Sequence, residues 1–322
     1  MSSPGKISPF WSVSPPSSRQ VARLSQRHRL VDPTRALCGY GFIRQPNRPE
    51  VAGMNPRLEA RLVAAASAVT RARVKASAWG MENIPQEGLF ILACSHIAQL
   101  DVFVPMEAVH HLGRRPRFVA KGELARVPLL GPWLKAMGMQ PADRRSGQAL
   151  RIEKESVRIL QDGHPLVIWP EGTLTRDPLK WPMSFKHGMA EIALAASRRV
   201  GYEIPLIPSV TWGGTNVHWW KPWPRPHLLL AFGEPVCYGD LLGDPATWQG
   251  AGASTGSADS HDSSVPSGWP AMTAVEELGY RVRQKMEDLE AEARGERPPA
   301  AGMWDYRTES RVPRPPLSWR CP

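Results

Sequence analysis

The sequence lacks any apolar run approaching the roughly 18–20 residues needed to span a bilayer, which argues against an integral helical membrane protein. The N-terminus, MSSPGKISPFWSV, also lacks the continuous apolar stretch of a secretory signal. Cysteine is scarce, and Cys38, Cys94, Cys237 and Cys321 are widely separated with no CxxC pair. This spacing argues against a zinc ribbon, a thioredoxin-like site and a disulfide scaffold, and it fits a reducing compartment.

The chain is rich in proline, tryptophan and basic residues. Its 322 residues include 33 Pro and 13 Trp, and 40 Lys+Arg against 30 Asp+Glu give a net charge of +10. A chain of this length can bury a sizeable core without disulfides or metals. Net charge bears on partners rather than on fold, and it leaves nucleic acid, an anionic membrane surface and an anionic small substrate as candidates.

The two ends of the chain differ in composition from its middle. Residues 1–50 are rich in Ser, Pro, Arg and Gln, so we expect a disordered N-terminal segment. Residues 243–269 are low in aliphatic residues and heavy in Gly, Ser and Asp, which predicts a flexible insertion. The Pro- and Arg-rich stretch 295–322 is predicted to be a loose tail.

A basic amphipathic helix is expected over residues 51–75. Leu58, Leu62, Ala65 and Val69 recur there at helical spacing between arginines. Such a helix either packs onto the domain that follows or lies on a membrane surface.

Residues 76–294 form the predicted domain, in which short apolar runs alternate with helical patterns. This alternation predicts an α/β fold, a single layered domain with a largely parallel central sheet flanked by helices. The expected strands are 89–94, 117–121, 165–170, 204–212 and 227–232, and the expected helices are 102–112, 147–162, 186–199 and 271–294.

Three polar constellations lie at or near the ends of predicted strands, where open α/β sheets bind their ligands. In the first, His96 follows the strand 89–94, and Asp101 lies five residues further on. A carboxylate that accepts a hydrogen bond from imidazole Nδ1–H holds the tautomer whose Nε2 is free to deprotonate a hydroxyl or thiol. Asp101 as a simple helix N-cap is the alternative interpretation.

The second constellation, Trp169 to Asp177, closes the strand 165–170. Gly172 allows a tight turn, while Thr173, Thr175 and Arg176 supply the hydroxyls and the guanidinium that a phosphate requires. An ordinary turn is the alternative.

The third constellation is basic. Lys121 to Leu124 follow the strand 117–121, and the stretch Gly138 to Arg145 ends in Arg144-Arg145 after a segment that could be a strand. Ordinary surface charge is the alternative.

Taken together, the order and spacing of these motifs resemble the phospholipid/glycerol acyltransferase family, typified by 1-acylglycerol-3-phosphate acyltransferases. The resemblance covers roughly residues 75–294. The matching residues are His96 and Asp101 for its His-x4-Asp motif, Arg144 (or Arg145) for its phosphate-contacting arginine, Pro170, Glu171, Gly172, Thr173 and Arg176 for its Pro-Glu-Gly-Thr box with a following arginine, and Ile204–Pro208 for its short Pro-bearing strand.

The chain departs from the family pattern at three places. Ala98 stands where serine is frequent, Leu174 and Thr175 separate Thr173 from Arg176, and Phe185-Lys186-His187-Gly188 replaces a Gly-Lys-x-Gly sequence. None of these departures touches the His96/Asp101 pair, so they concern substrate identity more than reaction type.

The resemblance implies acyl transfer from acyl-CoA or acyl-carrier protein to the hydroxyl of a lysophospholipid, in phosphatidic acid synthesis. It implies that His96 is the general base and Asp101 orients it, that Arg144, Thr173 and Arg176 bind the acceptor phosphate, and that Glu171 braces the loop or binds a glycerol hydroxyl. No metal or cofactor is expected. We expect a cytoplasmic enzyme, peripheral on the cytoplasmic face of an anionic membrane.

Two rival interpretations remain. The same chemistry could serve another acceptor, such as glycerol 3-phosphate, another lysolipid or a glycolipid. A basic nucleic-acid-binding protein is a remote rival, because the chain lacks a zinc-finger pattern, an RNP-type aromatic stretch and a basic-leucine heptad. Its Trp/Pro cluster, residues 219–224, instead suits an interfacial loop or a rigid surface connection.

Overall fold

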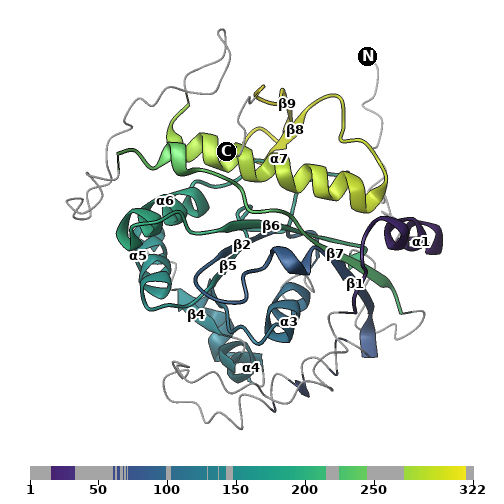
Figure 1. Cartoon of the computed structure of the whole chain (residues 1–322), viewed down its shortest axis with the longest axis horizontal. Helices are drawn as coiled ribbons and strands as arrows, with labels where there is room; N and C mark the ends of the chain where they lie inside the picture. Colours follow the sequence, from purple (N-terminus) through teal and green to yellow (C-terminus); the bar gives the residue numbers. More distant parts are fainter. Residues whose placement is uncertain are drawn as a thin grey trace, which may run out of the picture.

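The computed structural model describes residues 16–32, 61, 64–65, 68, 70, 72–98, 103–128, 130–136, 138–142, 148–214, 225–244 and 272–316. Figure 1 shows a layered α/β arrangement, with a central sheet between helices on its two faces. The helices are α1 (Ser18–Arg27), α3 (Phe103–His111), α4 (Leu130–Ala136), α5 (Gln148–Gln161), α6 (Gly188–Val200) and α7 (Ala274–Arg294), with short 3-10 turns η2 (Met81–Asn83), η4 (Gly122–Arg126) and η6 (Gly239–Leu241).

Seven strands form the central sheet in the order β1-β7-β6-β2-β5-β3-β4. Only β6 and β7 pair antiparallel within this sheet, while its other neighbouring strands are parallel. The strands are β1 (Lys75–Trp79), β2 (Ile91–Cys94), β3 (Arg117–Lys121), β4 (Met139–Ala142), β5 (Leu166–Ile168), β6 (Leu206–Trp212) and β7 (His227–Phe232), and β8 (Met303–Asp305) and β9 (Ser310–Val312) form a separate hairpin.

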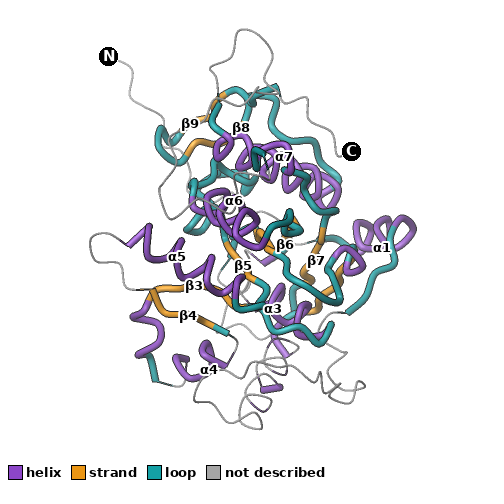
Figure 2. The backbone as a smooth tube through the Cα atoms, turned by 60° about the vertical axis from the view of Figure 1, so that its left-hand side comes forward, coloured by secondary structure: helices purple, strands orange, loops and turns teal. Residues whose placement is uncertain are grey.

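The sheet buries both of its faces, as near-continuous apolar strands require. Along β2, Ile91 and Ala93 join the core beneath α5, α6 and α7, whereas Leu92 and Cys94 join the core beneath α3 and α4. Figures 1 and 2 show α7 and α3 on opposite sides of the sheet. The alternation follows from the two-residue period of a strand, and it fixes which side chains at the strand ends face each layer.

Helix α7 carries end signals that the sequence supplies locally. Thr273 accepts a hydrogen bond from the Glu276 backbone N–H, and the Glu276 carboxylate accepts one from the Thr273 backbone N–H, which makes a capping box. Gly295 ends the helix in the left-handed region with φ of 69°. These caps define a helix of 21 residues, long enough to cross β6 and to reach the loop after β5.

The predicted fold class is confirmed, and each of the nine predicted strands and helices contains an observed element. Prediction erred mainly at the edges of the sheet, where β1 was not foreseen. The sequence also did not foresee that β7 would run antiparallel to β6, because strand direction depends on tertiary packing.

The expectation of disorder over residues 1–50 is wrong for residues 16–32. Helix α1 begins with a capping box at Ser17 and packs beside α7, where Gln20 donates to the Arg294 carbonyl at 2.6 Å. Leu24 is fully buried in the core, and Val31 forms an antiparallel bridge with Ala78 of β1. Helix α1 has few apolar residues, so its sequence alone did not indicate that it would pack against α7.

The expectation of a loose tail over residues 295–322 is wrong for residues 295–316. The hairpin β8–β9 packs against the loop after β5, where Ser184 donates its backbone N–H to the Trp304 carbonyl at 2.8 Å. Arg311 donates to the buried Asp177 carboxylate at 2.6 Å. Polar anchors of this kind hold the segment in place despite its high proline content.

Several predictions fall on residues outside the described part. Most of the predicted 51–75 helix lies there. Its described positions 61, 64, 65, 68, 70, 72 and 73 are helical, whereas Val74 is not and Lys75 begins β1. The Trp/Pro cluster 219–224 and nearly all of the insertion 243–269 also lie outside the described residues. Within the described part, no helix is long and apolar enough to cross a membrane.

The cysteines divide into two kinds. Cys94 is free and buried at the end of β2. Cys237, in contrast, is disulfide-bonded, whereas the cysteine spacing argued against a disulfide scaffold and for a reducing compartment.

Candidate active site

The loops after β2 and β5 meet at the carboxyl edge of the sheet. β2 and β5 are parallel neighbours, so the chains that leave them emerge side by side. The backbone N–H of Thr175 donates to the His96 carbonyl at 2.7 Å, which ties the two loops directly. Ser95 anchors the first loop to β6, because its hydroxyl accepts from the Thr211 N–H at 3.0 Å. The fold thus brings His96 and the Pro-Glu-Gly-Thr box together, as their positions after predicted strands indicated.

His96 lies half-buried beside the Trp169 ring, with their centroids 6.1 Å apart. Phe118 packs edge-on against Trp169 at 5.9 Å and holds that ring in place. Burial lowers the pKa of His96 below 6.5, against a smaller opposing effect of the Ala98 backbone. The imidazole is therefore neutral near pH 7 and able to accept a proton, which is the state that a general base requires.

The His96 Nδ1 atom is buried and has no hydrogen-bond partner among the described residues. A buried polar atom in this state calls for an acceptor or donor nearby. Asp101, predicted to orient His96, lies outside the described residues, as does Arg144 with its alternative Arg145. The position of these three side chains therefore stays a prediction.

The Pro-Glu-Gly-Thr box forms a tight turn. Gly172 has φ of 66°, and its N–H donates to the Trp169 carbonyl at 2.9 Å. Glycine is favoured here by the positive φ, and a Cβ on Gly172 would lie 2.8 Å from the Nζ of Lys186, whose side chain covers the turn. The Lys186 ammonium makes no hydrogen bond or ion pair within the described part of the chain.

Arg176 points away from this turn. It is exposed and pairs with Glu309 of the β8–β9 hairpin at 3.3 Å. The two residues inserted before it explain this placement, because Thr175 turns inward and donates to the Trp181 carbonyl at 3.1 Å. Thr173 remains partly exposed at the turn. Among the described residues, Lys186 is the cation that lies against the turn.

Glu171 is fully buried and does not face solvent or a ligand. Burial raises its pKa well above 4.5, and the negative charge of Glu290 acts in the same direction. The Thr175 hydroxyl and the backbones of His96 and Met183 oppose this rise, but neither carboxylate oxygen has a partner in hydrogen-bond geometry. Glu171 is thus enclosed by the protein, and whether it braces the loop or binds a glycerol hydroxyl stays a prediction.

Sequence reasoning missed Arg294, the residue that holds the loop from below. Arg294 donates to the Leu179 carbonyl at 2.8 Å and also to the Lys180 carbonyl and the Glu290 carboxylate. Its guanidinium lies between two tryptophan rings, 4.2 Å from the centroid of Trp181 and 3.9 Å from that of Trp212. No local signal marks it, since it follows the Pro-Glu-Gly-Thr box by more than a hundred residues.

Glu290 on α7 is predicted to make folding stability pH-dependent. Burial, with the charges of Asp177 and Glu287, raises the pKa of Glu290 to about 7, although Arg294 lowers it. The unfolded chain releases this proton near 4.5, so the folded state binds more protons between pH 4.5 and 7. The contribution of the Glu290 carboxyl group to the free energy of unfolding therefore decreases as the pH rises from 4.5 to 7.

Urea denaturation of the wild type and of Glu290→Gln across that window tests this expectation. Between pH 4.5 and 7 the free energy of unfolding should decrease less in the variant than in the wild type. The decrease that remains in the variant is attributed to Glu171. Equal pH dependence in both proteins would contradict the assignment.

Comparison with known proteins defines the class. Residues 76–212 match the family model described as Acyltransferase. This part of the chain therefore matches the acyltransferase family, which confirms the resemblance seen in its motifs.

Individual relatives carry a more particular name. The chain is 27% identical over 168 residues to 1-acyl-sn-glycerol-3-phosphate acyltransferase of Bacillus subtilis (strain 168), covering 52% of this chain and 77% of that protein. It is 31% identical over 116 residues to the enzyme of the same name from Borreliella burgdorferi, covering 33% and 45%. The chain thus spans most of the first relative and less than half of the second.

A solved structure with a similar arrangement is the 1-acyl-sn-glycerophosphate (LPA) acyltransferase PlsC from Thermotoga maritima. The TM-score is 0.48 at 21% sequence identity, with 75% of this chain and 86% of that chain covered.

Proposed function

We propose that this acyltransferase moves a fatty acyl group from a thioester carrier to the hydroxyl of a 1-acylglycerol 3-phosphate, which forms phosphatidic acid. One observation carries the proposal: a half-buried His96, whose pKa is lowered by burial, is tied at its backbone to a Pro-Glu-Gly-Thr turn that is covered by Lys186, whose ammonium makes no hydrogen bond or ion pair among the described residues. A base and a cation at one sheet edge suit an acceptor that carries both a hydroxyl and a phosphate. The names of the relatives agree with this acceptor.

His96 acts as the general base in the proposed mechanism. Its Nε2 takes the proton of the acceptor hydroxyl as the oxygen attacks the thioester carbonyl, and the carrier thiolate leaves as the tetrahedral intermediate collapses. Asp101 is proposed to accept a hydrogen bond from the Nδ1–H of His96 and to stabilise the imidazolium that forms, which then returns its Nε2 proton to the leaving thiolate. The unpartnered state of the buried Nδ1 within the described residues supports a need for such an acceptor.

Lys186, Thr173 and Arg176 are proposed to bind the acceptor phosphate, together with Arg144. Lys186 covers the turn at Gly172, and Arg176 can reach toward it only by leaving Glu309. Arg176 and Glu309 are both exposed, so water screens their pair and little free energy opposes its exchange for a phosphate.

Loss of either cation should weaken acceptor binding more than it slows the chemical step. Lys186→Ala and Arg176→Ala are each expected to raise the KM for lysophosphatidate about tenfold, since a charge-assisted hydrogen bond contributes about 1.5–3 kcal/mol. Steady-state kinetics at saturating thioester measure this, and Glu309→Gln is the control because it frees Arg176 without removing a cation. An unchanged acceptor KM in both variants would rule out the phosphate contact.

An acceptor panel with one acyl-CoA tests the proposed substrate. Lysophosphatidate should be acylated with a kcat/KM well above that for glycerol 3-phosphate, a neutral lysolipid or a glycolipid. If the enzyme preferred one of the other acceptors, the proposed acceptor would be wrong, whereas the proposed acyl transfer to a hydroxyl would stand. We also propose that an anionic membrane surface is where the acceptor is met, and cosedimentation with anionic liposomes tests that location.

A further inference from the structure

We propose that two adjoining cavities between α7 and the C-terminal segment bind the phosphate groups of a nucleotide-bearing ligand, of the acyl-CoA class. This inference rests on the proposed function, because it names the donor that the same enzyme uses. It is drawn from the shape and charge of the C-terminal segment, which lies beyond the residues matched by the family model.

The cavities adjoin one another and lead toward the catalytic turn. The larger has a volume of about 380 Å³ and lies between α7 and residues 297–315. The smaller, of about 130 Å³, is walled by α7, the β8–β9 hairpin and residues 184–187. Tyr280 and Arg283 line both. Because Lys186 lines the smaller cavity and covers Gly172, the path runs from the C-terminal segment to the Pro-Glu-Gly-Thr turn.

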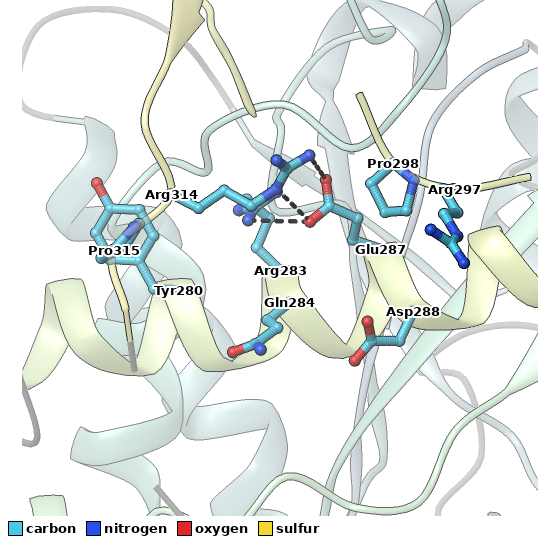
Figure 3. A pocket seen from close by; sticks show the side chains of 9 residues that line it. All are labelled: Tyr280, Arg283, Gln284, Glu287, Asp288, Arg297, Pro298, Arg314 and Pro315. Atoms are coloured by element: carbon cyan, nitrogen blue, oxygen red, sulfur yellow. Dashed lines mark hydrogen bonds and ion pairs between the residues drawn. The ribbon is translucent and has the colours of Figure 1, made fainter. Parts of the chain in front are cut away.

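Most acidic groups along this path have partners, although the carboxylate of Asp288, which also lines the larger cavity, makes no hydrogen bond or ion pair among the described residues. Glu287 accepts from Arg314 through both of its oxygens at 2.8 Å, as Figure 3 shows. Glu276 is engaged in the capping box with Thr273. Asp305 accepts from the Ser184 hydroxyl at 2.9 Å and from a backbone N–H at 3.0 Å. These carboxylates therefore leave little negative charge for the cations around them.

The basic groups are less completely paired. Arg297 is exposed and makes no hydrogen bond or ion pair within the described part of the chain. Arg307 is exposed too, and its side chain donates only to the Tyr306 hydroxyl. Lys186 completes this set at the catalytic end of the path. Arg297 and Arg307, which have no carboxylate partner among the described residues, suit a ligand with more than one phosphate, while Lys186 stays available to the acceptor.

Arg283 supplies a second, independent observation. It is only 2% exposed, its Nη2 lies 3.4 Å from Glu287, and its Nε and Nη1 atoms have no partner. Burial, with the nearby charge of Arg314, lowers the pKa of this guanidinium, so its charge is only partly compensated. An anion in the larger cavity would supply the missing negative charge.

The larger cavity also offers apolar surfaces that a bare anion does not need. Figure 3 shows the Tyr280 ring beside Pro315 on one side, and Pro298 beside Arg297 on the other, with Arg283 and Arg314 between them. An aromatic ring and arginine planes stack on a purine base, while the guanidinium groups take its phosphates. The volume lies within the usual range of small-molecule sites, about 300–1,000 Å³.

Calorimetric titration with CoA, adenosine 3′,5′-bisphosphate and inorganic phosphate tests the cavity itself. CoA and the bisphosphate should bind the wild type, and Arg297→Ala and Arg307→Ala should each raise their Kd about tenfold. Arg199→Ala is the matched control, because it removes an exposed arginine from α6 without touching either cavity, and it should leave the Kd unchanged. Absence of nucleotide binding, equal effects of all three variants, or phosphate binding as tight as that of the nucleotide would overturn the proposal.

Kinetics with two donors separate this proposal from the proposed function. Arg297→Ala should raise the KM for acyl-CoA and leave unchanged the KM for lysophosphatidate and that for an acyl-carrier protein donor. An unchanged acyl-CoA KM would overturn the cavity assignment, whatever the acceptor. Absence of transfer to lysophosphatidate, with nucleotide binding still dependent on Arg297, would instead overturn the proposed function and leave the cavity standing.

Discussion

Replacement of His96 by alanine is expected to reduce kcat by about 10²–10⁴-fold, the range that general-base assistance supplies. The variant should fold normally, because the buried Nδ1 of His96 has no hydrogen-bond partner among the described residues. The His96 side chain is also only partly buried. Steady-state transfer of a radiolabelled acyl group measures the loss. A folded His96→Ala protein with near wild-type transfer would show that another group is the base.

His164→Ala is the matched control for that experiment. His164 lies before β5, at the end of the strand opposite to Trp169, and its removal should leave kcat within about twofold of the wild type. In the wild type, the acid limb of the pH profile of kcat should have its midpoint below pH 6.5. The reason is that burial lowers the pKa of His96 and the neutral imidazole is the active base. A midpoint above 6.5 would contradict this environment.

Replacement of Arg294 by methionine is expected to lower the free energy of unfolding by about 3–5 kcal/mol, the cost of breaking a buried ion pair. Arg294 and Glu290 are 4% and 0% exposed, so the variant leaves a buried carboxylate without its cation. It also loses the donors to the Leu179 and Lys180 carbonyls and the contacts with two tryptophan rings. Urea denaturation measures the change.

A second substitution distinguishes the ion pair from the rest of this contact. Adding Glu290→Gln to Arg294→Met should restore part of the lost stability, because a neutral amide is cheaper to bury than a carboxylate. Arg199→Ala should change stability by no more than about 0.5 kcal/mol, as for other exposed sites. If Arg294→Met were as stable as the wild type, the proposed support of the catalytic loop from α7 would be wrong.

The edge of the sheet that we propose as the active site could be predicted because its signals are local. His96 and Glu171 each follow a short apolar run, and parallel strands place their carboxyl ends at one edge. Gly172 was assigned to a tight turn from its residue type alone, and its φ of 66° agrees. These features depend on a few neighbouring residues, which is why a pattern in the sequence reveals them.

The supports of that edge could not be predicted, because they depend on contacts between distant segments. Arg294 reaches the loop only once α7 lies across the sheet, and the β8–β9 hairpin holds Arg176 through Glu309. Proline and arginine in residues 295–316 were taken as signs of a loose tail. Their partners, such as Asp177 for Arg311, lie more than a hundred residues away in the sequence.

Product analysis of a reaction containing the purified protein, lysophosphatidate and acyl-CoA tests the central claim most directly. Mass spectrometry of the lipid and thiol titration of the carrier should show phosphatidate and free CoA formed in equal amounts, with both lost in His96→Ala. Thiol release without phosphatidate, or phosphatidate formed equally well by His96→Ala, would contradict a histidine-based acyl transfer to this acceptor.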